Sequence, residues 1–536
     1  MTDQDLFTRD TTGLTQVASP SDMRLADGDR LDLDIRPVRK NIDGAELRML
    51  AYNGSIPGPT LHVQQGSQIT VQTHNGGDVE TTVHWHGLRL ENRYDGVPHE
   101  TQAPIPVGGT YSYQVQFPDA GFYWYHPHMR EDFAQEMGLY GTIVVEPTDP
   151  TYWPAVDREL TLTLDDLLVE DGQIAPFLRS GPTFTAMGRF GNVLLINGET
   201  AFSAEVAAGD VVRLHLVNTA NTRIFNFAVR GARAKLVGGD SGRYERETFV
   251  EEVLLAPSER ATLDVHFHTP GEVPLEHRTP DRVYDLGAFS VTPAEGGGTA
   301  AASFDVLRTD PELTAEHQSI SPDLERAPDK VLAFVSRMPL LYGDHSSEGS
   351  SYACPMHPEV TATEPATCPK CGMKLVPSDA PPVSAHDGPT APHDHGDGLE
   401  WEDLMPEINR ASDPSNMIWQ LIDRETGAEN GAIDWAFTVG DRVKIRLVNE
   451  MDSDHPMHHP FHIHGAGRFL ILTRDGEPES NLVWKDTVLL RAGETVDILL
   501  DVSNPGLWMA HCHIAEHTES GMMFSFTVAR RPEPVG

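Results

Sequence analysis

Three stretches of this chain repeat one strand pattern: Gly66-Ser-Gln-Ile-Thr-Val-Gln-Thr-His-Asn75, Gly209-Asp-Val-Val-Arg-Leu-His-Leu-Val-Asn218 and Gly440-Asp-Arg-Val-Lys-Ile-Arg-Leu-Val-Asn449. Each begins with a turn glycine, continues as an apolar strand and closes on an asparagine. We interpret them as the same strand in a unit that occurs three times. The interval before the third stretch is the longer one, which predicts an insertion ahead of the third unit.

Short strand-like segments separated by Gly, Pro, Asn and Asp fill the rest of the chain, a pattern typical of antiparallel β-sandwiches. A length of 536 residues also exceeds what one ordinary core accommodates. We therefore expect an all-β protein with three sandwich domains, near residues 28–148, 155–300 and 401–530. The insertion is expected as a small module at residues 350–378 within a flexible linker.

Acidic residues dominate the charge, with 80 Asp and Glu against 40 Lys and Arg and a formal net charge of −40. Nucleic acids and anionic membranes would repel such a surface, so we expect neither as a partner. No apolar run approaches the roughly 20 residues that cross a bilayer. Residues 1–6 lack a basic or hydrophobic segment, which predicts a cytoplasmic protein, or a periplasmic or secreted one if a leader has been trimmed.

Histidines gather in four short clusters. They are His84-Trp85-His86, His126-Pro127-His128, His459-Pro460-Phe461-His462-Ile463-His464, and His511-Cys512-His513 followed by His517 and Met522. In a strand, His-x-His places both imidazoles on one face about 7 Å apart, where both can ligate a metal. One such doublet alone would favour ordinary packing histidines, but four together predict metal sites.

The last cluster adds softer ligands to the imidazoles. Two imidazoles, one thiolate and a weak axial methionine are the ligands of a blue-copper electron-transfer centre. Cys512 is also bonded through the backbone to His511 and His513. An electron arriving at the thiolate therefore has a short covalent path to the neighbouring imidazoles.

On these four motifs, in this order, the sequence resembles the multicopper oxidases, which include laccases, ascorbate oxidase and bacterial cuprous oxidases. The resemblance implies cupredoxin-like Greek-key domains, four copper ions, and O₂ as the electron acceptor. It implies type 1 copper ligands His459, Cys512, His517 and Met522, type 2 ligands His84 and His462, and type 3 ligands His86, His126, His128, His464, His511 and His513. The three-copper cluster would lie between domains one and three, with the middle domain as a spacer.

Oxygen reduction needs a source of protons near the cluster. Asp95, nine residues after His86, matches the position of the family's cluster acid. A second acid follows the last type 1 histidine in some relatives, but Thr518 occupies that position here and the nearest carboxylate is Glu519. We therefore predict Asp95 and Glu519 as catalytic acids, and Cys512 as the residue through which electrons pass.

The insertion carries its own metal signature, Cys354, His357, Cys368 and Cys371, with methionines beside them. Such soft ligands favour Cu(I) or Zn(II). The segment resembles the heavy-metal-binding module attached to some copper-export ATPases and efflux adaptors. Copper capture and a structural zinc site both remain open.

The expected reductants are phenols, Cu(I) or both, reaching an accessible edge of His459. Met457 matches a position that relatives use to bind substrate copper, and with His455 it is the predicted substrate-copper port. Two other functions fit the same motifs: a copper-binding resistance protein that sequesters metal, and a nitrite-reductase-like copper protein. Oxygen uptake separates the oxidase from both.

Overall fold

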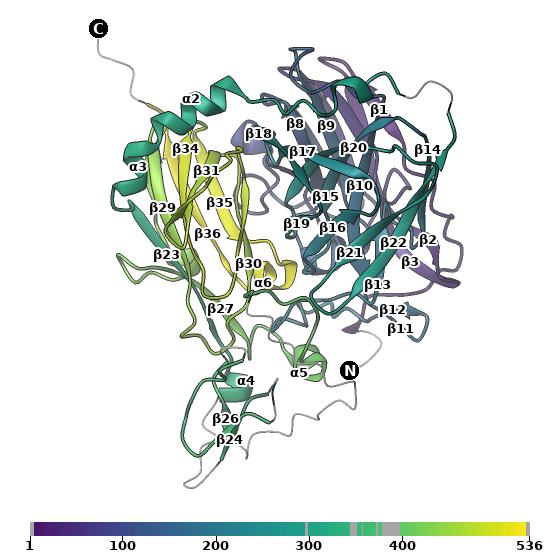
Figure 1. Ribbon diagram of the computed structural model, residues 1–536. Coiled ribbons are helices and arrows are strands. Elements are labelled where there is room, and N and C mark those ends of the chain that lie inside the picture. Colours follow the sequence, from purple (N-terminus) through teal and green to yellow (C-terminus); the bar gives the residue numbers. More distant parts are fainter. Residues whose placement is uncertain are drawn as a thin grey trace.

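The structure is a computed structural model that describes residues 5–294, 298–342, 351–355, 357, 359–370, 373–377 and 397–531. Three β-sandwiches make up most of it, and a small three-stranded lobe projects beneath the third (Figure 1). This confirms the predicted all-β class. Cys371, Met356 and residues 378–396 of the predicted module and linker lie outside the described residues.

The first sandwich packs a five-stranded sheet, in the order β1-β4-β9-β8-β6, on a four-stranded sheet, in the order β3-β2-β5-β7. The strands of the larger sheet are β1 (Asp22–Leu25), β4 (Thr60–Gln64), β9 (Gly141–Glu146), β8 (Gly121–His126) and β6 (His84–His86). Those of the smaller sheet are β3 (Ala45–Tyr52), β2 (Arg30–Ile42), β5 (Gln68–Asn75) and β7 (Thr110–Gln116).

The second sandwich has sheets ordered β13-β10-β15-β20-β17-β18 and β14-β22-β21-β16-β19, with the hairpin β11 (Val169–Glu170) and β12 (Gln173–Ile174) beside them. The six-stranded sheet contains β13 (Val193–Ile196), β10 (Arg158–Leu167), β15 (Val211–Asn218), β20 (Arg260–His266), β17 (Arg233–Gly239) and β18 (Gly242–Val250). The five-stranded sheet contains β14 (Phe202–Ala207), β22 (Val283–Thr292), β21 (Gly271–Arg278), β16 (Phe225–Val229) and β19 (Val253–Leu255).

The third sandwich has sheets ordered β27-β23-β29-β34-β31-β32 and β28-β36-β35-β30-β33. The first contains β27 (Ile418–Asp423), β23 (Lys330–Arg337), β29 (Arg442–Asn449), β34 (Thr495–Val502), β31 (Gly467–Arg474) and β32 (Glu477–Pro478). The second contains β28 (Ala436–Thr438), β36 (Met523–Ala529), β35 (Gly506–Cys512), β30 (His459–Ile463) and β33 (Thr487–Leu490).

The α-helices are short. They are α1 (Glu131–Ala134), α2 (Pro311–Ser319), α3 (Ser321–Glu325), α4 (Pro339–Tyr342), α5 (Pro406–Ala411) and α6 (Ala515–Glu519). Of these, α2, α3 and α5 lie at the edges of the sandwiches, whereas α6 lies near the centre of the view beside β30 (Figure 1). Helices α2 and α3 lead from the second sandwich to the third.

The three repeated stretches form equivalent strands, β5, β15 and β29. Each pairs in parallel with one neighbour and antiparallel with the other. The closing asparagine also has the same role in each, because Asn75, Asn218 and Asn449 donate from Nδ2 to a carbonyl of the loop that follows, at 2.9, 2.7 and 2.7 Å. The acceptor for Asn449 is the carbonyl of Met457, so this bond fixes the loop that leads into His459.

The third sandwich begins earlier than the predicted residue 401. Strand β23 precedes the insertion, yet it pairs antiparallel with β27 and in parallel with β29. The insertion therefore lies inside the third sandwich, between two neighbouring strands of one sheet. Pairing between strands so far apart in sequence leaves no local pattern, which is why the boundary was misplaced.

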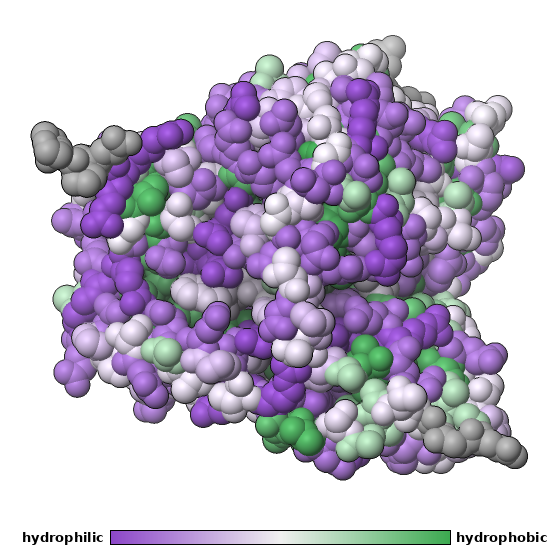
Figure 2. Space-filling model, turned by 90° about the horizontal axis from the view of Figure 1, so that it is seen from above, coloured by the Kyte–Doolittle hydropathy of each residue, from purple (hydrophilic) through white to green (hydrophobic). Residues whose placement is uncertain are grey.

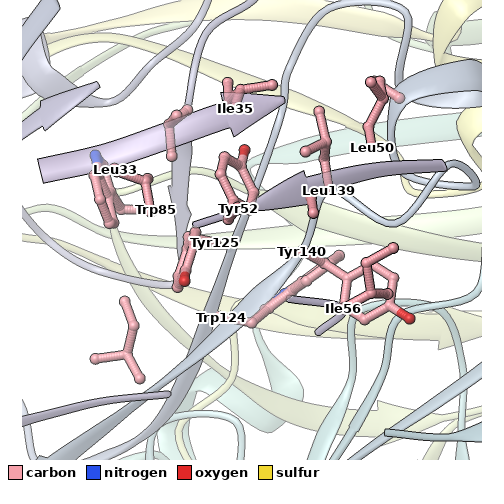
Figure 3. Packing of buried hydrophobic residues seen from close by; sticks show 14 of the residues in the cluster. Leu33, Ile35, Leu50, Tyr52, Ile56, Trp85, Trp124, Tyr125, Leu139 and Tyr140 are labelled. Carbon is pink, nitrogen blue, oxygen red and sulfur yellow. The ribbon is translucent and has the colours of Figure 1, made fainter. Parts of the chain in front are cut away.

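Side chains of β6 in the first sandwich alternate between the hydrophobic core and the face that carries the predicted metal ligands. Trp85 points into the hydrophobic core between His84 and His86, with its ring 5.6 Å from that of Tyr125. Tyr125 in turn lies 5.2 Å from Tyr52 of the opposite sheet (Figure 3). The same alternation that buries Trp85 therefore turns its two neighbours to the other face of β6.

The lobe consists of β24 (Tyr352–Ala353), β25 (Thr361–Ala362) and β26 (Val376–Pro377). It is anchored to the third sandwich: Lys374 forms an ion pair with Asp454 at 3.0 Å, and Tyr342 donates to the carbonyl of Lys374 at 2.6 Å. Met373 and Val376 are buried and pack in the hydrophobic core of the third sandwich.

The surface seen from above is mostly hydrophilic, with small scattered apolar patches (Figure 2). Within the described part of the chain, no helix has the length and apolar character needed to span a bilayer.

Candidate metal centres

One donor set lies inside the third sandwich, where the end of β35, the start of β30 and helix α6 meet. Cys512 Sγ is 3.5 Å from His459 Nδ1 and 3.7 Å from His517 Nδ1. Met522 is buried beside them, and its carbonyl accepts from the amide of Cys512 at 3.1 Å. Burial raises the pKa of the Cys512 thiol, so a bound cation is needed to hold it as a thiolate.

A second donor set lies between the first and third sandwiches. His464 Nε2 is 3.1 Å from His511 Nε2 and 3.3 Å from His128 Nε2. Three ring nitrogens that converge this closely cannot all be satisfied by hydrogen bonds to one another. Their lone pairs are arranged for a metal ion, and these residues form one of several groups of possible ligands.

The opposite nitrogens of these three rings are held in place. Asp95 Oδ2 accepts from His464 Nδ1 at 2.8 Å, and the carbonyl of Cys512 lies 2.8 Å from His511 Nδ1. Glu131 Oε1 lies 3.0 Å from His128 Nδ1. Such partners fix the orientation of ligating imidazoles.

A second trio consists of His86, His126 and His513, whose ring centroids are 5.0 to 5.7 Å apart. His86 Nδ1, His126 Nε2 and both nitrogens of His513 are buried without a hydrogen-bond partner. A buried polar atom left unpaired costs about 1–3 kcal/mol. Unpaired nitrogens at one point are therefore best explained as metal ligands.

His84 and His462 complete the cluster, with ring centroids 5.8 Å apart. The Nε2 atom of each is buried and unpaired, whereas each Nδ1 is bonded to a backbone carbonyl, of Asp95 at 2.7 Å and of Asp486 at 2.9 Å. The two rings therefore present the same free nitrogen towards the cluster.

Strand register brings the eight imidazoles together. In the first sandwich His84 lies opposite His126 on β6 and β8. In the third sandwich His462 lies opposite His511 on β30 and β35. The cluster thus straddles the interface of the two sandwiches, where the sequence places it.

Burial keeps most of these rings neutral, which is the form that binds metal. It lowers the pKa of His84, His86, His126, His464, His511 and His513 well below the usual value. Burial acts on His128 in the same direction, but the Glu131 carboxylate outweighs it and raises the pKa of His128 to about 9.

Asp95 lies at the cluster, as predicted from its spacing. Its side chain is fully buried, Oδ1 has no hydrogen-bond partner, and burial raises its pKa to about 8. Gly96 (φ +87°) makes this position possible, because a Cβ there would lie 2.0 Å from the carbonyl oxygen of Val83.

The Glu519 carboxylate accepts from the amide of Glu131 at 2.9 Å, and its role as a catalytic acid stays a prediction. Glu131, three residues after His128, is a further acid that contacts a cluster imidazole, at 3.0 Å from His128 Nδ1. Sequence reasoning missed it, although the i, i+3 spacing on the first turn of α1 was an available signal.

The predicted accessible edge of His459 is wrong. His459 is 1% exposed and His517 is fully buried. The Trp419 ring lies 4.0 Å from that of His517 and 5.0 Å from that of His459, while Phe334 stacks on His459 at 5.5 Å. Trp419 therefore closes the approach to both imidazoles.

The predicted port residues lie behind this tryptophan. His455 and Met457 are fully buried, and both ring nitrogens of His455 lack a hydrogen-bond partner. Burial lowers the pKa of His455 to about 4, so the ring is neutral at physiological pH. Asp454, the next residue back, is the one that pairs with Lys374 of the lobe.

The lobe brings three of its four predicted ligands together. His357 Nδ1 is 3.7 Å from Cys354 Sγ and 3.6 Å from Cys368 Sγ, and all three side chains are buried. These three residues form a group that could hold a metal ion. Cys371 lies outside the described residues.

The fold and these donor sets define a copper-binding oxidoreductase built from cupredoxin domains. Residues 34–150 and 405–532 each match a family described as multicopper oxidase, and residues 351–378 match one described as heavy metal binding domain. The chain belongs to the multicopper oxidase family and carries an inserted heavy-metal-binding module.

Known relatives span nearly the whole chain. Oxidoreductase OpS5 of Beauveria bassiana is 26% identical and covers 90% of this chain and 78% of its own. Copper resistance protein A of Escherichia coli is 24% identical and covers 92% of both. The crystal structure of a multi-copper oxidase from Pseudomonas thermotolerans has a TM-score of 0.64 at 24% identity, over 95% of this chain and all of the other.

Proposed function

We propose that the protein takes single electrons from a small reductant at a type 1 copper and reduces O₂ to water at a three-copper cluster. The supporting observation is Cys512, whose thiol lies in one donor set while its chain neighbours, His511 and His513, lie in the other. Cys512, in one donor set, is therefore bonded through the backbone directly to two residues of the other set, His511 and His513.

The proposed ligands are those predicted from sequence. They are His459, Cys512, His517 and Met522 for type 1 copper, His84 and His462 for type 2 copper, and His86, His126, His513, His128, His464 and His511 for the type 3 pair. The unpaired, buried ring nitrogens support this assignment. Bound copper supplies one-electron redox chemistry, through which four electrons and four protons convert one O₂ to two waters.

Asp95 is the proposed proton donor. With a pKa of about 8 it is protonated at neutral pH, and its Oδ2 already accepts from His464. The proton therefore resides on Oδ1, the oxygen without a partner. Asp95 lies behind the His464 ring, on the side away from the converging nitrogens, and is the acid from which a proton would pass to the cluster.

Cu(I) is the reductant that the surroundings of the type 1 ligands favour. A phenol needs direct contact with an imidazole edge, and both imidazoles are buried, with Trp419 packed on His517 and Phe334 stacked on His459. Met457 and His455 are the soft and imidazole ligands that a cuprous ion prefers, although both are as fully buried as the type 1 imidazoles. The lobe, anchored through Asp454, places a soft-metal site beside the same loop.

Cys512→Ser tests the proposal as a whole. Serine cannot supply the polarizable thiolate, so the variant should lose its intense visible band and all O₂ uptake with any reductant while keeping its fold. The measurements are absorption, oxygen consumption and circular dichroism. Retained colour and turnover would refute the assignment.

Asp95→Asn tests proton delivery. The amide retains an oxygen that accepts from His464 but cannot donate an acid proton. We expect turnover to fall about 10²-fold with the visible band unchanged. Wild-type turnover should also fall as pH rises above about 8, where Asp95 loses its proton, and the variant should lack this dependence. If turnover of the wild type and of Asp95→Asn depended on pH in the same way, Asp95 would have only a structural role.

Trp419→Leu tests the choice of reductant. Removing the indole uncovers His517 and His459, so kcat/KM for a phenol should rise severalfold relative to that for Cu(I). Trp419→Phe keeps a ring over His517 and serves as the matched control. Because a core substitution of this size costs about 3–5 kcal/mol, the visible band is measured to confirm that the copper site is intact. An unchanged phenol-to-Cu(I) ratio in Trp419→Leu would contradict the role of the tryptophan.

Cys354→Ser with Cys368→Ser separates the two functions of the lobe. If it captures copper, the double variant should bind Cu(I) more weakly and need more copper for cuprous oxidation, with phenol oxidation nearly normal. If it is a structural zinc site, the variant should release zinc and leave the copper dependence unaltered. Equal losses for phenol and Cu(I) would contradict both.

A further inference from the structure

We propose that Arg260, in the ligand-free middle sandwich, is a positioning residue for the copper cluster. It acts through Asp486 on His86 and His462, two of the proposed ligands. This inference rests on the proposed function, and it replaces the prediction that the middle domain is only a spacer.

Arg260 opens strand β20 and is completely buried. Its guanidinium forms a two-pronged pair with Asp486, with Nη1 donating to Oδ1 at 2.7 Å and Nη2 to Oδ2 at 2.5 Å. The remaining donors reach the carbonyls of Phe122 at 3.2 Å, Ser258 at 3.1 Å and Asp240 at 3.0 Å. The guanidinium therefore has one possible orientation, and it fixes that of the carboxylate.

Asp486 passes this orientation to two imidazoles of different sandwiches. Its Oδ1 accepts from Nε2 of His86, in the first sandwich, at 3.1 Å. Nδ1 of His462, in the third, lies 3.6 Å from the same Oδ1 and donates to the backbone carbonyl of Asp486 at 2.9 Å. These bonds select which nitrogen of each ring is left to face the cluster: Nδ1 of His86 and Nε2 of His462, both unpaired.

The pair sits where all three sandwiches meet. Gly87 of the first sandwich leaves room for it, because a Cβ there would lie 2.5 Å from Asp486 Oδ2 and 2.8 Å from Arg260 Nη2. Lys485, next to Asp486, forms a second pair with the middle sandwich, at 3.0 Å from Asp240. The third sandwich is thus joined to the second by two adjacent buried ion pairs at the point where it touches His86.

Charge explains why an arginine is needed here. Without its partner, the Asp486 carboxylate would be a buried, uncompensated charge next to the proposed copper ions. The carboxylate would no longer be held in one position, and His86 would lose the bond that orients its ring. Lysine restores the charge but donates from a single point, so it cannot hold both carboxylate oxygens in the plane that the fork defines.

The same sandwich offers a matched control in Arg213 and Asp264. Both side chains are 1% exposed, and the pair has the same two-pronged geometry, at 2.9 and 3.0 Å. The other hydrogen bonds of this guanidinium go to Glu159 and to the carbonyl of Pro154, within the second sandwich and the segment leading into it.

The experiment compares Arg260→Lys with Arg213→Lys in the full-length, copper-loaded protein. We expect Arg260→Lys to keep the type 1 visible band but to hold cluster copper about 10- to 100-fold more weakly, which is the usual cost of losing a partner of a ligating residue. Dialysis against a chelator, copper analysis and the type 2 electron paramagnetic resonance signal measure this. Arg213→Lys should lose comparable thermal stability and keep its copper and its signal.

Asp486→Asn provides a second route should Arg260→Lys fold poorly. If Arg260 acts through Asp486, the double variant should lose no more cluster copper than Asp486→Asn alone. Additive losses would overturn the inference, as would an unchanged type 2 signal in Arg260→Lys or an equal loss in Arg213→Lys. A wild-type protein that binds copper without a type 1 band would instead overturn the proposed function, which keeps the two failures distinct.

Discussion

The constraint on which the rest of the structure depends is the burial of imidazole nitrogens that have no hydrogen-bond partner. Nitrogens of His84, His86, His126, His462 and His513 are left unpaired in a buried interface between two sandwiches. Each would destabilise the folded state unless a metal accepts its lone pair. In all of these residues except His513, a backbone carbonyl or a carboxylate holds the opposite nitrogen, so the ring cannot turn to find another partner.

Sequence patterns predicted which histidines come together, because His-x-His alternation and the strand repeat are local properties of the chain. They could not reveal residues that act across large sequence separations. Arg260 lies in the second sandwich, which has no ligand motif. Trp419 contacts the proposed type 1 imidazoles inside the core of the third sandwich, a contact that no local pattern indicates. Strand β23 was overlooked for a similar reason, since its partners follow the insertion.

The two proposed copper centres differ in what encloses their ligands. At the cluster, enclosure comes from ion pairs and hydrogen bonds at a junction of three sandwiches. At the type 1 ligands it comes from aromatic rings and methionines, with a metal-binding lobe anchored alongside. A polar shell suits proton transfer and charged intermediates, whereas a soft apolar shell suits a thiolate and a cuprous ion.

The distance in sequence between cooperating residues also sets the order of folding. His86 and its partner Asp486 are separated by 400 positions. Contacts this remote carry a large loop-closure cost and form late, after the individual sandwiches have collapsed. While the chain is being synthesised, the first sandwich therefore exists with only its own four histidines of the cluster, His84, His86, His126 and His128. The completed pocket is the last part of the molecule to form, so metal loading reports that folding is finished.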